Sequence, residues 1–322
     1  MTSQRQPDSI SLEDVLAARE RLAGVPRTPM ILLEGVTSGG LYLKLENLQP
    51  IRSFKLRGAS NALALLDPAE LAAGVYTASA GNMAQGLAWA ARRRDVRCTV
   101  VVPDGAPQTK LDGIRRLGAD IVSLPYDQWW NVLVTHRYEP LEPAHFIHPV
   151  SDVAVMAGNG TIGLEILDDL PEVDTVLVPF GGGGLSCGIA AAIRGQRPEV
   201  RVYGCEVETA TPLAAALAAG RAVETTRTPT FVDGIGARTV LAEMWPPAQR
   251  LLAGALVVSL AEVAAAIAFM IERASVVGEG AAGASVAAGL KGLGGGRRVV
   301  CVVSGGNIDP THIATIAKGL VP

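Results

Sequence analysis

Short apolar runs alternate with longer amphipathic segments along most of the chain. The runs at 75–78, 98–102 and 120–124 are mostly apolar, and the segments 82–94 and 108–117 between them have helical composition. Apolar runs of this length are typical of strands that are buried on both faces of a parallel sheet. The pattern therefore predicts a β-α-β-α-β unit in the first half of the chain.

The same rhythm returns after an irregular stretch, 126–149, which holds Trp129, Trp130 and three of the four histidines. Two such units predict an α/β protein with two open, twisted domains, mainly parallel sheets and a ligand-binding cleft between them. We expect residues 1–65 and 152–322 to form a large domain and residues 66–151 a small one. Further strands are predicted at 41–45, 175–179, 201–206 and 298–303, and further helices at 12–22, 56–66, 159–169, 185–194, 212–219, 260–273 and 281–290.

Composition narrows the class of protein. The 322 residues are 49% hydrophobic and 18% charged, with a net charge of −3, which is typical of a globular protein and does not favour a nucleic-acid partner. The N-terminus, 1–8, is polar and does not resemble a signal peptide. The uncharged run 175–193 is broken by Pro179 and four glycines, so no membrane span is predicted. We expect a cytoplasmic protein.

The cysteines and histidines do not show the spacing of a metal site. Cys98, Cys187, Cys205 and Cys301 form no CxxC pair, and the four histidines form no HExxH motif. We therefore predict that the four cysteines are buried, reduced thiols and that the protein binds no metal.

A lysine and a glycine loop are the first candidates for chemistry. Lys55 lies between the predicted strand 41–45 and the Ala/Leu-rich helix 56–66, where its side chain can project into a cleft. Gly181, Gly182, Gly183 and Gly184 join a strand to a helix that begins at Leu185. Free N–H groups and the helix dipole at such a junction suit a phosphate. The loop matches neither the dinucleotide pattern GxGxxG nor the triphosphate pattern GxxxxGK[ST].

Four more loops accompany these two features. In Ser79-Ala80-Gly81-Asn82, backbone N–H groups suit a carboxylate, and the Asn82 amide can bond a ring hydroxyl. The segment 304–307 directly follows the last predicted strand. The others are 159–161 and the glycine-rich segment 278–283.

With these motifs together, the chain resembles the fold type II pyridoxal-phosphate (PLP) enzymes, in the branch of threonine/serine dehydratases and serine racemases. The resemblance runs from about residue 12 to about residue 316 and implies a tryptophan synthase β-like fold with PLP in the cleft between the domains. It implies that Lys55 forms the Schiff base with PLP, Phe54 packs near the ring, Asn82 bonds the 3-hydroxyl, Gly181, Gly182, Gly183, Gly184 and Leu185 hold the phosphate, Ser304 faces the pyridine nitrogen, and the backbone N–H groups of Ser79, Ala80, Gly81 and Asn82 hold the substrate carboxylate.

The activity that the resemblance implies is α,β-elimination from a 3-hydroxy amino acid such as L-threonine or L-serine, which yields a 2-oxo acid and ammonia. In racemases of this family a serine acts on the face opposite the lysine, and Ala80 stands at that position here. Met83 replaces a usual histidine, and Pro212 replaces an acid of the cation site found in some relatives. A racemase and a non-catalytic PLP-binding protein remain alternatives.

Three further expectations complete the prediction. Relatives with biosynthetic roles carry a C-terminal regulatory domain, and its absence from this sequence favours a catabolic-type enzyme. A homodimer or a higher homo-oligomer is expected. For Trp129, Trp130 and the nearby histidines, packing is the default interpretation; the alternative is that this segment lines the cleft and selects the substrate.

Overall fold

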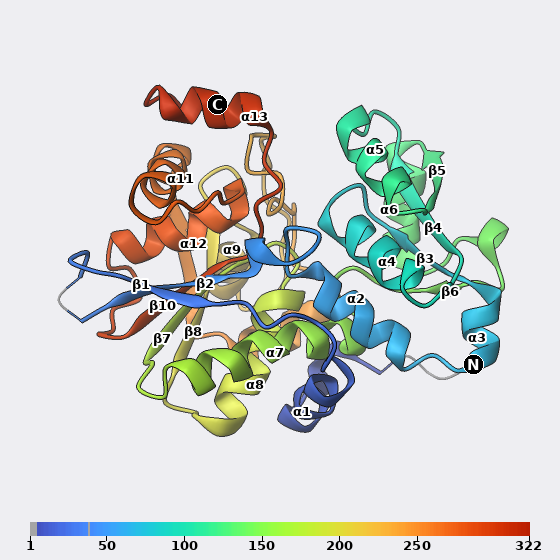
Figure 1. Ribbon diagram of the computed structural model, residues 1–322, viewed down its shortest axis with the longest axis horizontal. Helices are drawn as coiled ribbons and strands as arrows, with labels where there is room; N and C mark the ends of the chain where they lie inside the picture. Colours follow the sequence, from blue (N-terminus) through green and yellow to red (C-terminus); the bar gives the residue numbers. More distant parts are fainter. Residues whose placement is uncertain (1–4, 38) are drawn as a thin grey trace.

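The computed structural model describes residues 5–37 and 39–322 and has two sheets with helices packed around them (Figure 1). The first four residues of the predicted polar N-terminus lie outside the described part. The strands are β1 Met30–Leu33, β2 Leu41–Leu45, β3 Val75–Ala78, β4 Cys98–Pro103, β5 Asp120–Leu124, β6 His145–Phe146, β7 Thr175–Pro179, β8 Arg201–Val207, β9 Gly254–Val258 and β10 Val299–Val303. The α-helices are α1 Leu12–Arg21, α2 Lys55–Ala64, α3 Pro68–Ala73, α4 Asn82–Arg92, α5 Gln108–Arg116, α6 Tyr126–Thr135, α7 Val153–Asp169, α8 Gly184–Gln196, α9 Pro212–Ala219, α10 Trp245–Leu251, α11 Leu260–Ala274, α12 Gly280–Leu290 and α13 Pro310–Ala317.

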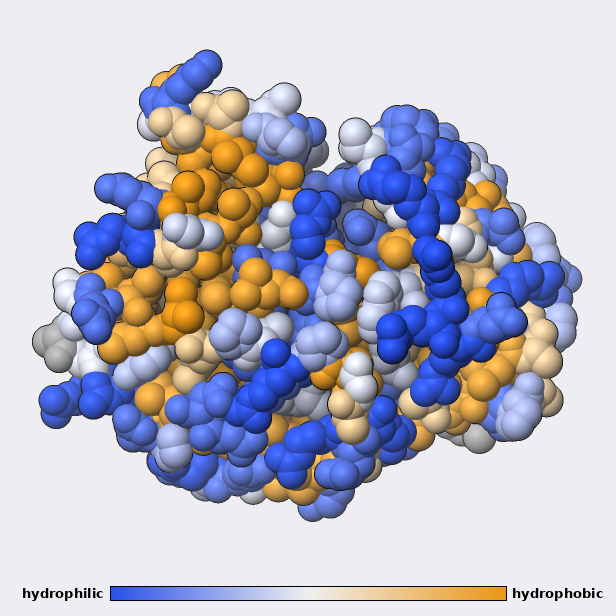
Figure 2. Space-filling view, in the orientation of Figure 1, coloured by the Kyte–Doolittle hydropathy of each residue, from blue (hydrophilic) through white to orange (hydrophobic). Residues whose placement is uncertain are grey.

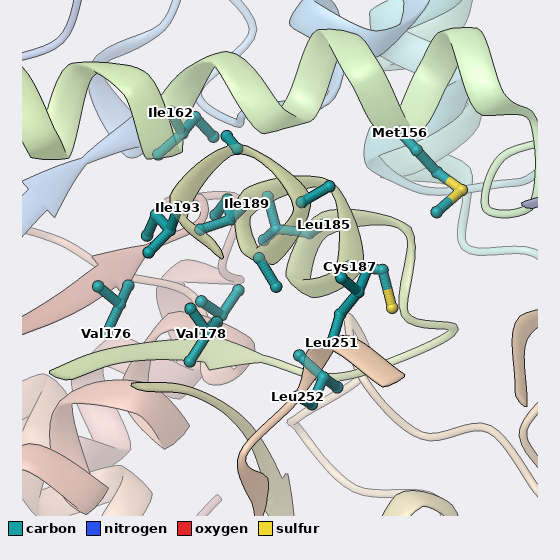
Figure 3. Packing of buried hydrophobic residues seen from close by; sticks show 14 of the residues in the cluster. Met156, Ile162, Val176, Val178, Leu185, Cys187, Ile189, Ile193, Leu251 and Leu252 are labelled. Carbon is teal, nitrogen blue, oxygen red and sulfur yellow. The ribbon is translucent and has the colours of Figure 1, made fainter. Parts of the chain in front are cut away.

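The larger sheet has the strand order β1-β2-β10-β7-β8-β9, and only the edge pair β1–β2 is antiparallel. Successive residues of a strand point to opposite faces, so Val176 and Val178 meet one layer of helices while Leu177 meets the other. Figure 3 shows the first layer, where Leu185, Ile189 and Ile193 of α8 pack over β7. Helices α11 and α12 cover the other face. The expected double-sided burial is confirmed.

The smaller sheet has the strand order β5-β4-β3-β6, and all its pairs are parallel. Helices α2 and α4 pack on one face, where Leu63, Leu87 and Val100 share a cluster. Helix α6 covers the other face through Val132 and Leu133. Each sheet therefore has its own core. The boundaries at residues 65/66 and 151/152 stay a prediction.

Several elements differ from the sequence predictions. The irregular stretch is helix α6 followed by the two-residue strand β6. Helix α7 begins at Val153 rather than 159, because the Asp152 side chain accepts hydrogen bonds from the backbone of Ala154 and Val155. Strands β1 and β9 and helices α3, α10 and α13 were not predicted. The apolar run of β9 adjoins that of α11, and short apolar runs of this kind do not distinguish strand from helix.

All four cysteines are buried and free, as predicted. In the described ranges, no helix is long and apolar enough to cross a membrane.

Candidate active site

A cavity of about 530 Å³ lies where the two sheets face each other. Loops that follow the carboxyl ends of β3, β7 and β10 line it, which is the usual place for a ligand in an open α/β sheet. In Figure 2 the surface is hollowed between the part that carries α11 to α13 and the part that carries α5. A larger cleft of about 870 Å³ contains none of the predicted site residues. The smaller cavity brings together all the predicted positions: Phe54, Lys55, Ser79, Ala80, Gly81, Asn82, Gly181, Gly182, Gly183, Gly184, Leu185 and Ser304.

Lys55 is the first residue of α2, and backbone pairing fixes its position. Ser53 forms an antiparallel bridge with Gly305, and the Phe54 N–H donates to the Ser304 carbonyl at 3.0 Å. The Lys55 Nζ donates to the Pro149 carbonyl at 2.7 Å. Burial lowers the pKa of Lys55 to about 8, and the opposing charge of Glu279 limits the fall. Part of the Lys55 population is therefore unprotonated near physiological pH.

The glycine loop is shaped by packing as well as by its N–H groups. A Cβ at residue 182 would lie 2.6 Å from a Val150 methyl, and one at 184 would lie 2.5 Å from the Val150 carbonyl. Gly183 has a φ of +94°, which favours glycine. Gly184 begins α8, so the first N–H groups of this helix have no acceptor within the helix. The loop can bind an anion, but close approach to Val150 also requires glycine.

Both polar atoms of the Asn82 amide already have hydrogen-bond partners in the structure. Its Nδ2 lies 3.0 Å from each carboxylate oxygen of Glu279, and its Oδ1 accepts from the Asn307 Nδ2 at 2.8 Å. Burial raises the pKa of Glu279 to about 7. The sequence highlighted 278–283 as a glycine-rich segment without a role for this carboxylate. The position of this glutamate, between two glycines and directly before a buried helix, is the sequence feature that could have pointed to a role in the site.

The segment 79–82, which is predicted to bind the substrate carboxylate, also has fewer free N–H donors than the sequence suggested. The Ser79 N–H donates to the Val101 carbonyl, and the Gly81 N–H donates to the Ser79 Oγ. Asn82 is the first residue of α4, so its N–H has no acceptor within the helix. The N-terminus of α4 is therefore the stronger part of this candidate carboxylate site.

Ser304 follows β10 and is 1% exposed. Its Oγ has no hydrogen-bond partner among the described residues. A buried hydroxyl without a partner is costly unless a ligand satisfies it. Ser304 therefore fits a neutral ligand nitrogen better than a strong positive charge.

An apolar wall faces the polar loops. Tyr126, Trp129 and Leu133 lie on α6 at helical spacing and line the cavity together with Met83. Trp130 does not line it. Both tryptophans contact the core of the small sheet. Trp129 therefore packs in the core, as expected by default, and also lines the cleft, as the alternative proposed.

His136, His148 and Glu243 place potential ligand atoms within 4.8 Å of one another. However, the His148 Nδ1 accepts the N–H groups of Val150 and Ser151 at 3.1 and 2.8 Å, so the remaining ring nitrogen, Nε2, carries the proton in the neutral ring. A metal there would have to displace this proton. Packing explains the cluster better.

The comparisons with known proteins agree with this geometry. The family model "Pyridoxal-phosphate dependent enzyme" matches residues 22–305. An L-threonine ammonia-lyase of Thermotoga maritima is 42% identical over 97% of this chain and 79% of its own length. The structure of maize serine racemase superposes with a TM-score of 0.89 at 29% identity, covering 95% of this chain and 96% of that one. The processed form of threonine deaminase isoform 2 from Solanum lycopersicum gives 0.86 at 31% identity, covering 96% and 92%.

The chain belongs to the pyridoxal-phosphate dependent enzyme family. The predicted fold type II architecture and the predicted cofactor are confirmed.

Proposed function

We propose that this protein catalyses the α,β-elimination of a 3-hydroxy amino acid such as L-threonine or L-serine to a 2-oxo acid and ammonia. The observation that carries the proposal is the Lys55 amine, which is held in the cavity with a lowered pKa beside the N-terminus of α8. The likeness to threonine ammonia-lyases and deaminases supports this reaction over others of the family.

The residues of the cavity fit PLP. The N–H groups at the start of α8 suit its phosphate, the Ser304 hydroxyl suits its ring nitrogen, and Lys55 suits its aldehyde. Bound PLP supplies an electron sink for the α-carbon of an amino acid. The proposed roles of Phe54, Asn82 and Leu185 rest on their place around the same cavity.

Separate protein groups would bind the substrate, remove its α-proton and contact the ring nitrogen. The N-terminus of α4 would hold the substrate carboxylate and fix the α-carbon. The Lys55 amine would take the α-proton, since its lowered pKa provides a neutral base. Ser304 is a hydroxyl rather than a carboxylate, so it does not hold a proton on the ring nitrogen, which favours prompt loss of the β-hydroxyl.

Absorption spectra and product assays test the proposal. The purified protein should absorb visible light as a PLP enzyme and release 2-oxo acid and ammonia from L-threonine or L-serine. Lys55→Ala should lose both the bound-cofactor band and turnover. Undiminished turnover by Lys55→Ala would refute the assignment, and a yellow protein inactive on a broad amino-acid panel would favour the non-catalytic alternative.

The racemase alternative depends on a second acid or base. The Ala80 methyl cannot move a proton, and its position matches the serine that racemases use. Ala80→Ser should therefore make racemisation of L-serine measurable by chiral chromatography, because a positioned acid–base group contributes about 10²–10⁴-fold. If the unsubstituted protein already racemises faster than it eliminates, elimination is not its main reaction.

The α6 wall supports a further proposal about the substrate. Trp129 lines the cavity and its neighbour Trp130 does not, which makes a matched pair of variants. We expect Trp129→Ala to change the ratio of kcat/KM for threonine, serine and bulkier 3-hydroxy amino acids, while Trp130→Ala leaves that ratio unchanged. Equal profiles for both variants would exclude substrate selection by this wall.

A homo-oligomer also remains a proposal, as do the cytoplasmic location and the catabolic role. Leu32, Leu48 and Val277 are exposed large apolar side chains, which are common at subunit interfaces. Light scattering on the purified protein would test the oligomeric state.

A further inference from the structure

Glu279 is a buried carboxylate that the reaction described above does not use. It is 6% exposed and occupies the N-cap position of α12, yet its side chain does not cap that helix. The side chains that usually cap a helix from this position are the shorter ones of Ser, Thr, Asp and Asn. This one instead reaches across the cavity to Asn82.

The contacts of Asn82 fix which way its amide points. The Glu279 carboxylate accepts from the Asn82 Nδ2, while the Asn307 Nδ2 donates to the Asn82 Oδ1. Asn307 is itself held by a second bond to the Ile51 carbonyl at 3.0 Å. An amide nitrogen carries two hydrogens, so one N–H can serve Glu279 while the other is left for a ligand.

The surrounding backbone leaves room for this carboxylate and little else. A Cβ at residue 305 would lie 2.6 Å from the Glu279 Oε1, so any side chain larger than glycine there would displace the carboxylate. The Glu279 N–H donates to the Gly305 carbonyl at 2.9 Å. This pairing ties Glu279 to the segment that also carries Ser304.

Charged groups from three other elements face Glu279. The charge of Asp233, in the loop before α10, raises the pKa of Glu279, and the charge of Lys110 of α5 lowers it. Glu279 in turn raises the pKa of Lys55 at the start of α2. Burial is the largest effect and raises the pKa of Glu279 to about 7, while the Asn82 hydrogen bond opposes the rise. Ionised Glu279 is therefore the form that the Asn82 amide stabilises.

We propose that Glu279 is a positioning residue: it orients the Asn82 amide across the join between the two sheets, so that one N–H faces the hydroxyl of the bound cofactor. The proposal rests on the role proposed above for Asn82. Without Glu279, only the Asn307 bond would hold the amide, and the Asn82 N–H groups would no longer have a fixed direction. Glu279 would then affect the cofactor only through Asn82, which is a testable condition.

A double-mutant cycle on cofactor binding tests this condition. Apoprotein is titrated with PLP, and the dissociation constant and the visible absorption maximum are recorded for Asn82→Ala, Glu279→Met and the double variant. Loss of one oriented hydrogen bond should weaken binding by about 3- to 10-fold in each single variant. The double variant should be no weaker than Asn82→Ala alone.

Two further variants separate positioning from general structure. Glu279→Gln keeps an acceptor for the Asn82 amide and should restore affinity to within about twofold of the unsubstituted protein, since the hydrogen bond is retained. Glu206→Gln removes a carboxylate that is also buried and has a pKa raised to about 7 but lies outside the cavity, and it should leave PLP affinity and spectrum unchanged. If Glu279→Met does not fold, Glu279→Leu replaces it in the cycle.

Additive losses in the double variant would overturn the proposal, because Glu279 would then act independently of Asn82. No change in Glu279→Met, or a loss in Glu279→Gln as large as in Glu279→Met, would also overturn it. If Asn82→Ala binds PLP normally, both the role of Asn82 and this proposal fail. These outcomes concern cofactor binding alone, so they do not depend on which amino acid is the substrate.

Discussion

Lys55 shows how strongly one residue depends on its surroundings. An exposed lysine keeps its proton at neutral pH and is a poor nucleophile or base. Here burial lowers the pKa from 10.5 to about 8, while the Pro149 carbonyl holds the amine in the cavity. The reactivity of the residue is thus a property of the cavity.

The pH dependence of cofactor capture should report this pKa. Because only the neutral amine attacks an aldehyde, the rate at which apoprotein binds PLP covalently should rise with pH and level off above about pH 8. Stopped-flow absorbance measures the rate. A rise that continues to pH 10 would show that the amine behaves as an ordinary lysine.

Glu206 leads to a prediction about stability. It is fully buried, and burial raises its pKa from 4.5 to about 7, although it accepts N–H groups from Leu213 and Ala214. Between pH 4.5 and 7 the folded state then binds more protons at this residue than the unfolded state, so stability from this group is present below pH 4.5 and is lost as pH rises through 7.

Urea unfolding of apoprotein at pH 5 and pH 8 measures the effect. Glu206→Gln should reduce the loss of unfolding free energy between these two pH values by about 2–3 kcal/mol. Glu20→Gln, on the exposed side of α1, should leave the loss unchanged. An unaltered loss in Glu206→Gln would mean that this carboxylate ionises freely in the folded protein.

At the scale of elements, the start of α2 is anchored by buried charge. Arg57, two residues after Lys55 in the first turn of α2, contacts Glu46 at 2.8 Å and Glu165 at 2.7 Å. Lys44 contacts the Glu165 Oε2 at 2.6 Å, and Arg57 also donates to this oxygen at 3.0 Å. Buried charges of this kind are tolerated only when all are paired, so the network fixes where α2 begins relative to β2 and α7.

Arg57→Met should therefore lower the unfolding free energy by about 3–5 kcal/mol, because it leaves Glu46 buried without its charged partner and Glu165 with Lys44 alone. The surface variant Arg115→Met, which removes an exposed pair with Asp112, should cost less than about 1 kcal/mol. Urea unfolding compares the two. Similar losses in both would show that the buried network does not stabilise the start of α2.

At the scale of the whole molecule, two sheets with separate cores meet around the cavity. Helix α2 packs against both α4 and α7, and Lys110 of α5 pairs with Asp233 at 2.5 Å beside the cavity. Both side chains of this pair are substantially exposed. Such a pair contributes little to stability, but both residues line the cavity, so its loss can affect substrate binding.

Lys110→Asp should raise KM about 2- to 10-fold with little change in melting temperature, because it replaces an exposed ion pair beside the cavity with an exposed like-charge contact. The charge-swapped double variant Lys110→Asp/Asp233→Lys should restore part of the loss. Steady-state kinetics and thermal melts at low and high salt measure both effects. A KM that is equally high in the double variant would mean that Lys110 acts on the substrate directly and not through the pair.

The local sequence was a good guide where one element decides the outcome. The strands 75–78, 120–124 and 175–179 and the helix 212–219 appear with the predicted bounds, because apolar runs and capping residues act over a few positions. The motifs also led to the correct family and cofactor, which the comparisons confirm. The roles of the individual site residues remain predictions, although the fold gathers them around one cavity.

The sequence by itself determined the α/β pattern, the lysine between strand and helix, and the glycine loop before α8, since each depends on neighbours along the chain. Only the tertiary structure decided the lowered pKa of Lys55, the contact of Val150 with the glycines and the hydrogen bond between Asn82 and Glu279. These depend on burial and on residues far apart in the chain, 197 positions in the case of Asn82 and Glu279, and no local pattern encodes such contacts.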